Sequence, residues 1–374
     1  MSKDNNKNLS VTVIMIGVVK APSTGGEIFN NKVFNYLKSS GVNVYSLSIP
    51  PERKWIPLPI RLLISNIRIL LKIIKLQPSS AIIYEDCYSY PRLFLTNWWA
   101  AMKGHKIAML MQISLNIQHR LFRKSYLRKI NTLLLNYFLK YGDIYLANSA
   151  DSKSELQHLG CDSNKIEMVG CGFDFKRLKE KPKFNKIASS ENIQIIYVGN
   201  IQTRKGVYQL VKAVSKLTDL NFLLNIVGSY AIDPAYYNRI KSFVINNNLE
   251  HKISFLGRVS DDSLKKIYED SDIFVLPSLH ETFGIVLLEA MSFGLPIVAT
   301  DVGAIPELVS DDENGVLVRP DDPYSLANAM RQLMLSPDKR KKFGNKGYEF
   351  IVANRDYYSW DSVGERILNA LLKL

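Results

Sequence analysis

The chain has 374 residues, which exceeds the size at which a single hydrophobic core keeps growing, so we expect two domains. With 47% hydrophobic and 22% charged residues, the composition is that of an ordinary globular protein. Cys87, Cys161 and Cys171 are too few for a disulfide framework and lack the spacing of a redox or zinc site, which indicates a reducing, cytoplasmic setting.

Neither a leader nor a membrane span is expected. The polar N-terminus and the short apolar run at 11–19 lack the layout of a signal peptide. No stretch reaches the roughly 18 uncharged apolar residues that suggest a membrane span. The sequence therefore predicts a soluble or peripheral protein.

The net charge of +13 is unevenly distributed. Residues 1–187 carry 28 Lys and Arg against 12 Asp and Glu, net +16, which leaves 20 against 23, net −3, for residues 188–374. This asymmetry predicts that the first half alone meets an anionic surface or partner.

The first half alternates strands with helices. A continuous β-branched run at 11–19 is typical of a buried parallel strand, and apolar residues at helical spacing follow it over 29–41. The next expected strands are 42–49, 81–86, 106–113 and 143–149. The charge-rich segment 175–192 is the expected linker.

A second alternating series follows the linker. Its expected strands are 193–200, 221–228, 252–258, 272–278 and 296–301, with a helix near 208–217. Two doubly wound domains in tandem are therefore expected. In such folds ligands bind at the carboxyl ends of the strands, so the loops after strands are the places to look for chemistry.

One loop and helix in the second half carry two unusual acids. Glu281 lies in the loop after strand 272–278, and Glu289 lies about one turn into the following helix, whose free N-terminal amides are suited to a phosphate or diphosphate. A carboxylate in either place can accept hydrogen bonds from a sugar or a ribose. The alternative is that Glu281 only caps the helix and Glu289 is solvated, but the apolar neighbours of Glu289 leave little room for a polar face.

The stretch HETFGIVLLEAMSFGLPIVATDVGAIPELV resembles the signature of retaining GT-B glycosyltransferases of family 4, also called glycosyl transferases group 1. Further segments match in the same order across nearly the whole chain: APSTGGE (21–27), GCGFDFKRL (170–178), YVGNIQTRKG (197–206), ISFLGRVSDDSLKKIYEDSDIFVLPS (253–278) and NGVLVRPDD (314–322). The resemblance implies a GT-B fold, in which two Rossmann-like, doubly wound parallel-sheet domains face a central cleft.

The resemblance also implies domain bounds and roles. We expect an acceptor-binding domain over 1–187, a nucleotide-sugar-binding domain over 188–352, and a helix over 353–374 that packs back on the first domain. Glu281 would contact the hydroxyls of the transferred sugar and steady its developing positive charge. Glu289 would bind the ribose, and Val259 would lie where the family seats the base. The other donor-binding residues implied are Phe283 and Gly284, which would shape the sugar pocket, and Ile285 and Val286, whose amides would hold the diphosphate.

Lys205 and Arg204 follow a strand, where cations can neutralise the leaving diphosphate without a metal, so no metal is expected. The alternative, two solvated charges at a helix start, would oppose the helix dipole. The family commonly has Arg directly after the strand glycine, where this chain has Asn200, and Arg204 is expected to substitute. Asn200 and Gly26 are also expected among the donor-binding residues. Gly26 would let the backbone approach the diphosphate or the acceptor, although a simple tight turn also explains it.

The acceptor side departs from the family as well. Many relatives carry a His at the end of a first-domain strand, whereas this chain has Gln112 or Ser114 there, with His119 following inside a basic stretch. Retaining chemistry fits the lack of an evident base, because the diphosphate oxygen can itself take the acceptor proton.

Two amphipathic segments, 60–77 and 119–142, carry much of the excess positive charge. Basic helices of this kind suit an anionic membrane surface, while an ordinary helix packed on the sheet with a solvated basic face remains the alternative for both.

The leading hypothesis is a sugar transferase with no bound cofactor, which uses a UDP- or GDP-sugar and a glycan or lipid-linked acceptor at the cytoplasmic membrane face. Two alternatives are an epimerase-like GT-B enzyme acting on the nucleotide-sugar alone and a basic nucleic-acid-binding protein. No nucleic acid is expected as a partner, because the basic stretches lack a recognisable binding motif.

Overall fold

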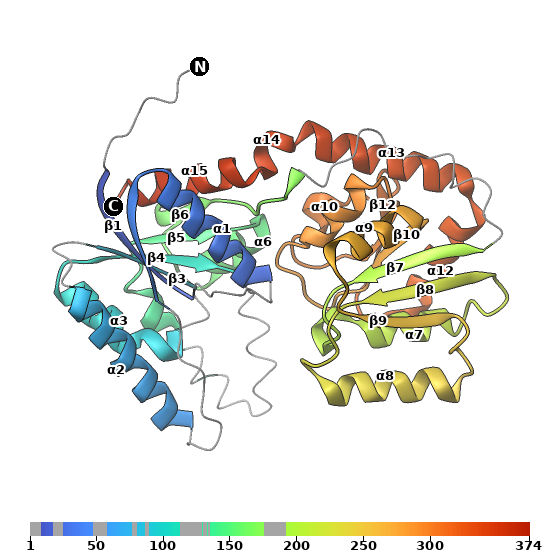
Figure 1. Cartoon of the computed structure of the whole chain (residues 1–374), viewed down its shortest axis with the longest axis horizontal. Coiled ribbons are helices and arrows are strands. Elements are labelled where there is room, and N and C mark those ends of the chain that lie inside the picture. Colours follow the sequence, from blue (N-terminus) through green and yellow to red (C-terminus); the bar gives the residue numbers. More distant parts are fainter. Residues whose placement is uncertain are drawn as a thin grey trace. The chain divides into compact units, whose positions relative to one another are not determined.

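The computed structural model of the protein describes residues 9–17, 25–47, 58–76, 81–86, 90–112, 129, 133, 135–175 and 192–374. The chain divides into two compact units (Figure 1). The first unit is Met1–Gly172 with Tyr357–Leu374, and the second is Phe173–Asp356. The expected boundary at 187/188 and nearly all of the expected linker lie outside the described residues.

The first unit is built on a parallel sheet with the order β2-β1-β3-β4-β5-β6. Its strands are β1 (Leu9–Ile16), β2 (Val42–Leu47), β3 (Ile82–Asp86), β4 (Lys106–Met111), β5 (Ile144–Ala147) and β6 (Ile166–Met168). The apolar runs predict the first five strands correctly, because central parallel strands are buried on both faces. The short β6 was not expected, since three residues carry no readable pattern.

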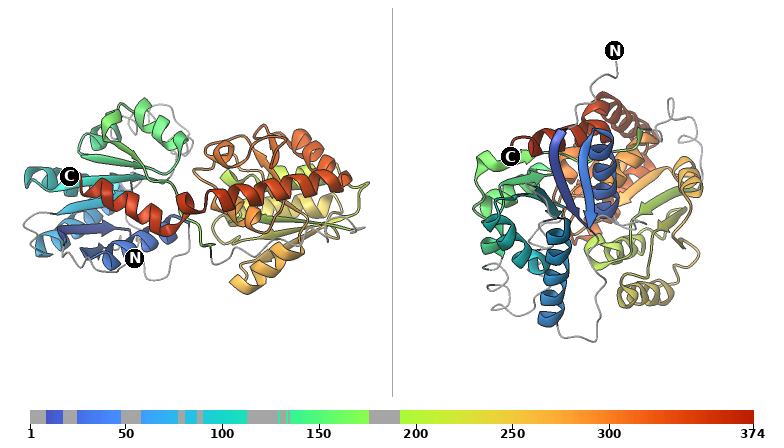
Figure 2. Two further views of the ribbon diagram at one scale, coloured as in Figure 1. Left: turned by 90° about the horizontal axis from the view of Figure 1, so that it is seen from above. Right: turned by 60° about the vertical axis from the view of Figure 1, so that its left-hand side comes forward.

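Helices cover both faces of this sheet (Figures 1 and 2). They are α1 (Gly25–Ser39), α2 (Leu58–Leu76), α3 (Tyr90–Met102), α6 (Ala150–His158) and α15 (Trp360–Leu371), with a 3-10 turn at Ser163–Lys165. α15 packs on α1, where the Trp360 and Phe29 ring centroids lie 5.6 Å apart. Gly364 permits the approach, because a Cβ there would lie 2.2 Å from Cγ of Tyr36. The end of the chain therefore belongs to the core of the first unit.

The second unit has a second parallel sheet with the order β12-β11-β10-β7-β8-β9. Its strands are β7 (Ile193–Val198), β8 (Phe222–Val227), β9 (Ile253–Gly257), β10 (Ile273–Leu276), β11 (Ile297–Thr300) and β12 (Gly315–Val318). The chain runs outward in one direction from β7 and in the other from β10. The topological switch point therefore lies between β7 and β10, which is where doubly wound sheets bind ligands.

The helices of the second unit differ at their N-termini, where only some have a side-chain cap. They are α7 (Val207–Val214), α8 (Pro234–Asn246), α9 (Asp261–Asp270), α10 (Ile285–Ser292), α11 (Ile305–Leu308), α12 (Pro323–Leu335) and α13 (Pro337–Ala353), with a 3-10 turn at Thr203–Lys205 and the short α14 (Arg355–Tyr358) at the border of the two units. Side chains of Asp233, Ser260, Asp322 and Ser336 accept first-turn amides. The two predicted doubly wound parallel sheets are thus both present.

Candidate active site

The two loops at the switch point of the second unit bring together a buried ion pair. Lys205 ends the 3-10 turn that follows β7, and Glu281 lies in the loop that follows β10. Lys205 Nζ contacts Glu281 Oε2, and the side chains are only 11% and 7% exposed. Ser278 Oγ donates a hydrogen bond to the same carboxylate oxygen at 3.2 Å. The structure therefore joins two residues that the sequence assigned separately.

Backbone contacts fix these loops against each other. The amide of Leu279 donates to the Arg204 carbonyl at 2.8 Å. Gly206 has a φ of 67°, and a Cβ on it would lie 1.8 Å from the Pro277 carbonyl oxygen. On the other side, a Cβ on Gly303 would lie 1.7 Å from the carbonyl oxygen of Glu281 itself. Only glycine fits these two places, so the position of the ion pair depends on both.

Electrostatics keeps Glu281 ionised. Burial raises the pKa of the carboxyl, but the charges of Lys205 and Arg204 and the hydrogen bonds from Lys205 and Ser278 outweigh burial, and the pKa is lowered. Burial lowers the pKa of Lys205, and the Glu281 carboxylate opposes that effect. The second unit thus presents a fixed negative charge next to two basic side chains.

Phe283 and Gly284 connect Glu281 to the N-terminus of α10. Phe283 is buried, while Gly284 has a φ of 87° and makes no side-chain cap. Ile285 and Val286 form the first turn of α10 and are partly exposed. Without a side-chain cap, the first-turn amides of α10 are suited to an anionic ligand.

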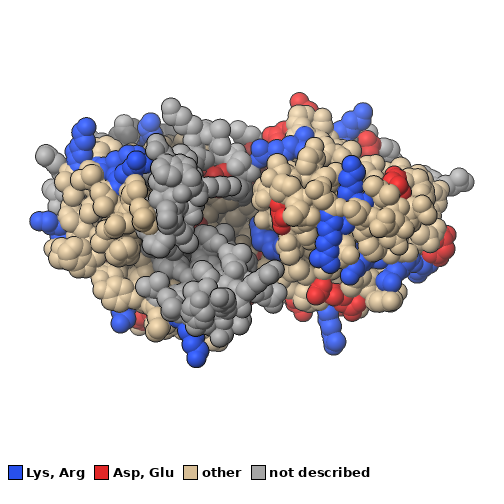
Figure 3. Space-filling model, turned by 90° about the horizontal axis from the view of Figure 1, so that it is seen from below, with Lys and Arg blue, Asp and Glu red and all other residues tan. Residues whose placement is uncertain are grey.

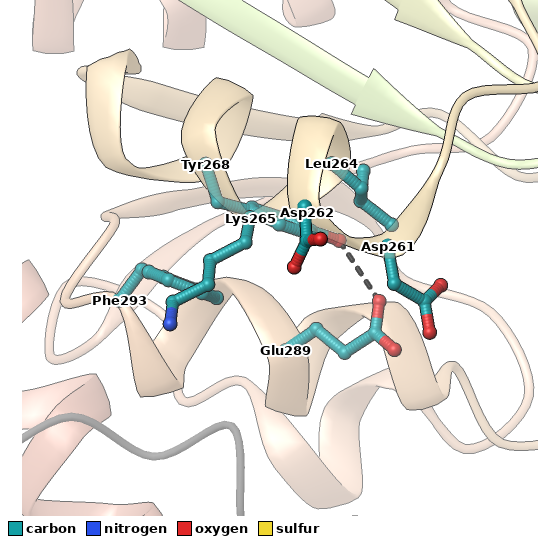
Figure 4. Close-up of a pocket in the computed structure, with 7 residues that line it drawn as sticks. All are labelled: Asp261, Asp262, Leu264, Lys265, Tyr268, Glu289 and Phe293. Carbon is teal, nitrogen blue, oxygen red and sulfur yellow. Dashed lines mark hydrogen bonds between the residues drawn. The ribbon is translucent and has the colours of Figure 1, made fainter.

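Glu289 lies further along α10, in a pocket of about 130 Å³ between α9 and α10 (Figure 4). The Tyr268 hydroxyl donates a hydrogen bond to Glu289 Oε2 at 3.1 Å. The Tyr268 ring is stacked on Phe293 with centroids 5.1 Å apart and an interplanar angle of 5°. The remaining lining residues are Asp261, Asp262, Leu264 and Lys265. The hydrogen bond from Tyr268 orients the Glu289 carboxylate. Because Glu289 is partly exposed, its carboxylate is still accessible from the pocket.

The other predicted residues are placed as follows. Val259 is partly exposed and directly precedes Ser260, the N-cap of α9. Asn200 follows β7, and its carbonyl accepts a hydrogen bond from the Tyr197 hydroxyl at 3.3 Å. Gly26 belongs to α1 of the first unit, where a Cβ would lie 2.3 Å from Gln112 Oε1. Ser114 and His119 lie outside the described residues.

Gln112 lies at the end of β4 against the start of α1, and its Nε2 donates to Asn30 Oδ1 at 2.9 Å. Of the three residues expected near the acceptor, Gln112 is therefore the one that the structure describes. In the part of the chain that the structure describes, no group of three or more His, Cys, Asp or Glu side chains is placed to hold a metal ion.

Sequence reasoning missed three supporting residues: Ser278, Tyr268 and Gly303. Ser278 lies in the same loop as Glu281, three positions before it, whereas Gly303 contacts Glu281 from the loop that follows β11. Tyr268 is four positions from Leu264, a spacing that predicts a shared helix face but does not reveal the partner on α10. Only the tertiary arrangement identifies the roles of Tyr268 and Gly303, whereas the short spacing between Ser278 and Glu281 is a signal in the sequence.

The chain is similar to known proteins first in sequence and then in fold. Residues 179–350 match the model of the family Glycosyl transferases group 1. An uncharacterised glycosyltransferase of Methanocaldococcus jannaschii is 34% identical over 176 residues, which are 47% of this chain and 43% of that relative. The chain thus spans less than half the length of this relative.

Solved structures extend the likeness to the whole fold. Sucrose-phosphate synthase from Thermosynechococcus elongatus has a TM-score of 0.77 at 20% identity, with 97% of this chain and 98% of that chain covered. Anabaena HepE in complex with UDP and glucose has a TM-score of 0.74 at 18% identity, with 97% and 99% covered. The predicted GT-B type of fold, with two Rossmann-like parallel-sheet domains, is therefore confirmed. Within this fold, residues 179–350 are the part of the sequence that is similar to Glycosyl transferases group 1.

Proposed function

We propose that the protein is a retaining glycosyltransferase of family 4, which moves a sugar from a nucleotide-diphosphate-sugar to an acceptor hydroxyl. The observation that carries this proposal is the buried pair of Lys205 and Glu281 at the switch point, one loop before the uncapped α10. Buried charges are costly, and their retention in a ligand-binding loop favours a role in chemistry over a role in stability.

In this proposal the diphosphate binds to the amides of Ile285 and Val286 and to the cations of Lys205 and Arg204. These groups stabilise the charge that develops on the leaving diphosphate, so the reaction is metal-independent. Glu281 is ionised, and it contacts the sugar hydroxyls and steadies the positive charge that develops on the ring. The acceptor attacks from the face that the diphosphate leaves, and a diphosphate oxygen takes its proton.

The donor is a UDP- or GDP-sugar, with the ribose on Glu289 and the base next to Val259. The pocket between α9 and α10 supports this placement, because a hydroxyl donor can reach the Glu289 carboxylate there. Anabaena HepE, whose fold is similar, is described in complex with UDP and with UDP-glucose.

The acceptor is a glycan or lipid-linked glycan of glycolipid, lipopolysaccharide or cell-surface polysaccharide synthesis. It binds to the basic first domain, 1–187, with Gln112 on the acceptor side, while Gly26 of the same domain lets the backbone approach the donor diphosphate. The net charge of +16 in this half supports an anionic acceptor and peripheral contact with the cytoplasmic face of an anionic membrane. The donor-binding domain then spans 188–352, and the helix over 353–374 supports the first domain.

A panel of nucleotide-sugars tests the proposal. A true donor raises the melting temperature of the protein, because it binds only to the folded state. Products from that donor are then measured with and without acceptor extracts. Transfer of the sugar with release of the nucleoside diphosphate supports the proposal, and an α-linked product from an α-linked donor supports retention.

Two results contradict the proposal. If no nucleotide-sugar changes the melting temperature, the assigned donor site is wrong. If the donor alone is converted quantitatively to an isomer, the protein is an epimerase-like GT-B enzyme.

A further inference from the structure

One side of α2 exposes a continuous row of large aliphatic side chains. The row follows the helical spacing along 19 residues and consists of Ile60, Leu63, Ile67, Leu71 and Ile74, each between 42% and 59% exposed. The opposite side, with Asn66, Ile69 and Ile73, is fully buried. α2 therefore has a packed face of its own and a second apolar row that the fold leaves in contact with solvent, which is unusual for a surface helix.

Basic side chains lie directly beside this row. Arg68, Lys72 and Lys75 each follow a member of the row by one position, and all three are exposed. The sequence of α2 contains no acidic residue. We call these three cations together with the five aliphatic residues the α2 face.

The neighbouring helix continues the pattern. α3 packs beside α2, and the Leu95 amide donates to Asn66 Oδ1 at 3.0 Å. Phe94, Trp98 and Met102, spaced four residues apart, are exposed on α3, whose sequence also contains no acid. In Figure 3 the described surface of the first unit has a broad uncharged area bordered by Lys and Arg with very little red, whereas the second unit has both colours intermingled.

Resting on the membrane contact in the proposed function, we propose that the α2 face is the surface that docks in the plane of an anionic lipid bilayer. The aliphatic row would enter the boundary between headgroups and acyl chains, and the row of cations would bind to anionic headgroups. No helix among the described residues is long and apolar enough to cross a membrane, so α2 lies on the bilayer and does not span it. A second copy of the chain fits less well, because a symmetric contact would bring the cation rows close together.

Sedimentation with vesicles tests this inference on the full chain, without donor or acceptor, so the result is separate from that of the transfer assay. The wild-type protein should bind to vesicles of phosphatidylcholine with phosphatidylglycerol, bind much less to phosphatidylcholine alone, and dissociate at high salt. Ile67→Gln with Leu71→Gln should weaken binding by about tenfold or more, since two apolar side chains no longer leave water. Lys72→Gln with Lys75→Gln should weaken binding to the anionic vesicles by about tenfold or more and leave the weak binding to neutral vesicles unchanged.

Matched controls come from α8 of the second unit, where Ile245 is 48% exposed and Lys241 is also exposed. Ile245→Gln and Lys241→Gln should leave vesicle binding unchanged, and unchanged melting temperatures of all variants would show that folding is intact.

Three outcomes would overturn the proposal. In the first, wild-type and Ile67→Gln/Leu71→Gln proteins sediment equally with anionic vesicles. In the second, neither binds, and the wild-type protein instead forms a dimer that this variant abolishes. In the third, DNA binds as tightly as vesicles and only the lysine variant weakens both.

Discussion

Two buried glutamates, one in each unit, have opposite ionisation properties. Glu85 lies on β3 and Glu281 follows β10, and they are 0% and 8% exposed. Burial raises the pKa of Glu85 to about 8, against a partial lowering by the hydrogen bond that Asn97 Nδ2 donates at 2.7 Å. At Glu281 the cations outweigh burial and the pKa is lowered. Neighbouring cations therefore decide which of two similarly buried acids is charged at neutral pH.

Glu85 has the properties of a structural acid, whereas we propose a catalytic role for Glu281. A neutral Glu85 avoids the cost of a buried charge, which suits a position between sheet and helix. Lys205 and Glu281 are both charged and buried, so the cost of burying a charge applies to each of them. They lie in the loops where a doubly wound sheet binds ligands. We therefore expect substitutions of Glu281 to affect chemistry, and substitutions of Glu85 to affect stability alone.

The largest expected effect is on transfer by Glu281→Gln, which keeps the shape of the side chain and removes its charge. Loss of this preorganised charge should lower kcat by about a hundredfold or more. The measurement is the steady-state rate with the donor found in the panel. Glu349→Gln, in an exposed pair with Lys346, is the matched control and should keep full activity. Equal rates for Glu281→Gln and wild type would remove Glu281 from the mechanism.

The next effect is on stability, through the partner of Glu281. Lys205→Met leaves a buried carboxylate without its closest cation, and the free energy of unfolding at neutral pH should fall by about 3 kcal/mol. Adding Glu281→Gln to the Lys205→Met variant should restore much of the lost free energy of unfolding. The corresponding exposed pair, Lys346 and Glu349, should contribute less than about 1 kcal/mol.

Denaturant unfolding of the two single variants and the double variant gives the coupling of each pair. Additive effects of Lys205→Met and Glu281→Gln would mean that the buried contact does not couple the two residues.

Above pH 4.5, Glu85 should give a pH dependence of stability that Glu281 does not, because the pKa of Glu281 is lowered and its effect falls at acidic pH. The folded pKa of about 8 is above the ordinary value of 4.5, so the folded state holds a proton that the unfolded state loses. Stability contributed by this proton is complete below pH 4.5 and is lost as the pH rises to 8. Relative to wild type, the stability of Glu85→Gln should therefore rise by up to about 5 kcal/mol between the two ends of this window, at about 1.4 kcal/mol for each pKa unit.

Melting temperatures across the same window measure this gain, with Glu349→Gln as the exposed control. A constant difference between wild type and Glu85→Gln at every pH would mean that Glu85 is not protonated in the folded protein.

Local sequence patterns predict most of the strands, but they do not predict contacts between distant parts of the chain. Continuous apolar runs identify most of the strands, because a parallel strand that is buried on both faces does not alternate apolar and polar residues. They miss β6 and β12 and give no strand order, and the separation of 76 positions between Lys205 and Glu281 hides their contact. Only the adjacency of β7 and β10 reveals it. In the same way, the basic residues of α2 are readable from sequence, but the exposed row with Ile67 and Leu71 is not, because most of the helix is apolar.

The smallest expected effect concerns how Glu289 is held for the ribose. Tyr268→Phe removes one hydrogen bond to Glu289 and keeps the ring stacked on Phe293. Since such a bond contributes about 1 kcal/mol, the KM for the donor should rise about fivefold while kcat changes little. A 2′-deoxy nucleotide-sugar has no 2′-hydroxyl to contact Glu289. Tyr268→Phe should therefore reduce the affinity for this analogue less than it reduces the affinity for the ordinary donor. If kcat falls and KM does not, Tyr268 supports the transition state and not the ribose, and the difference in role between Glu281 and Glu289 disappears.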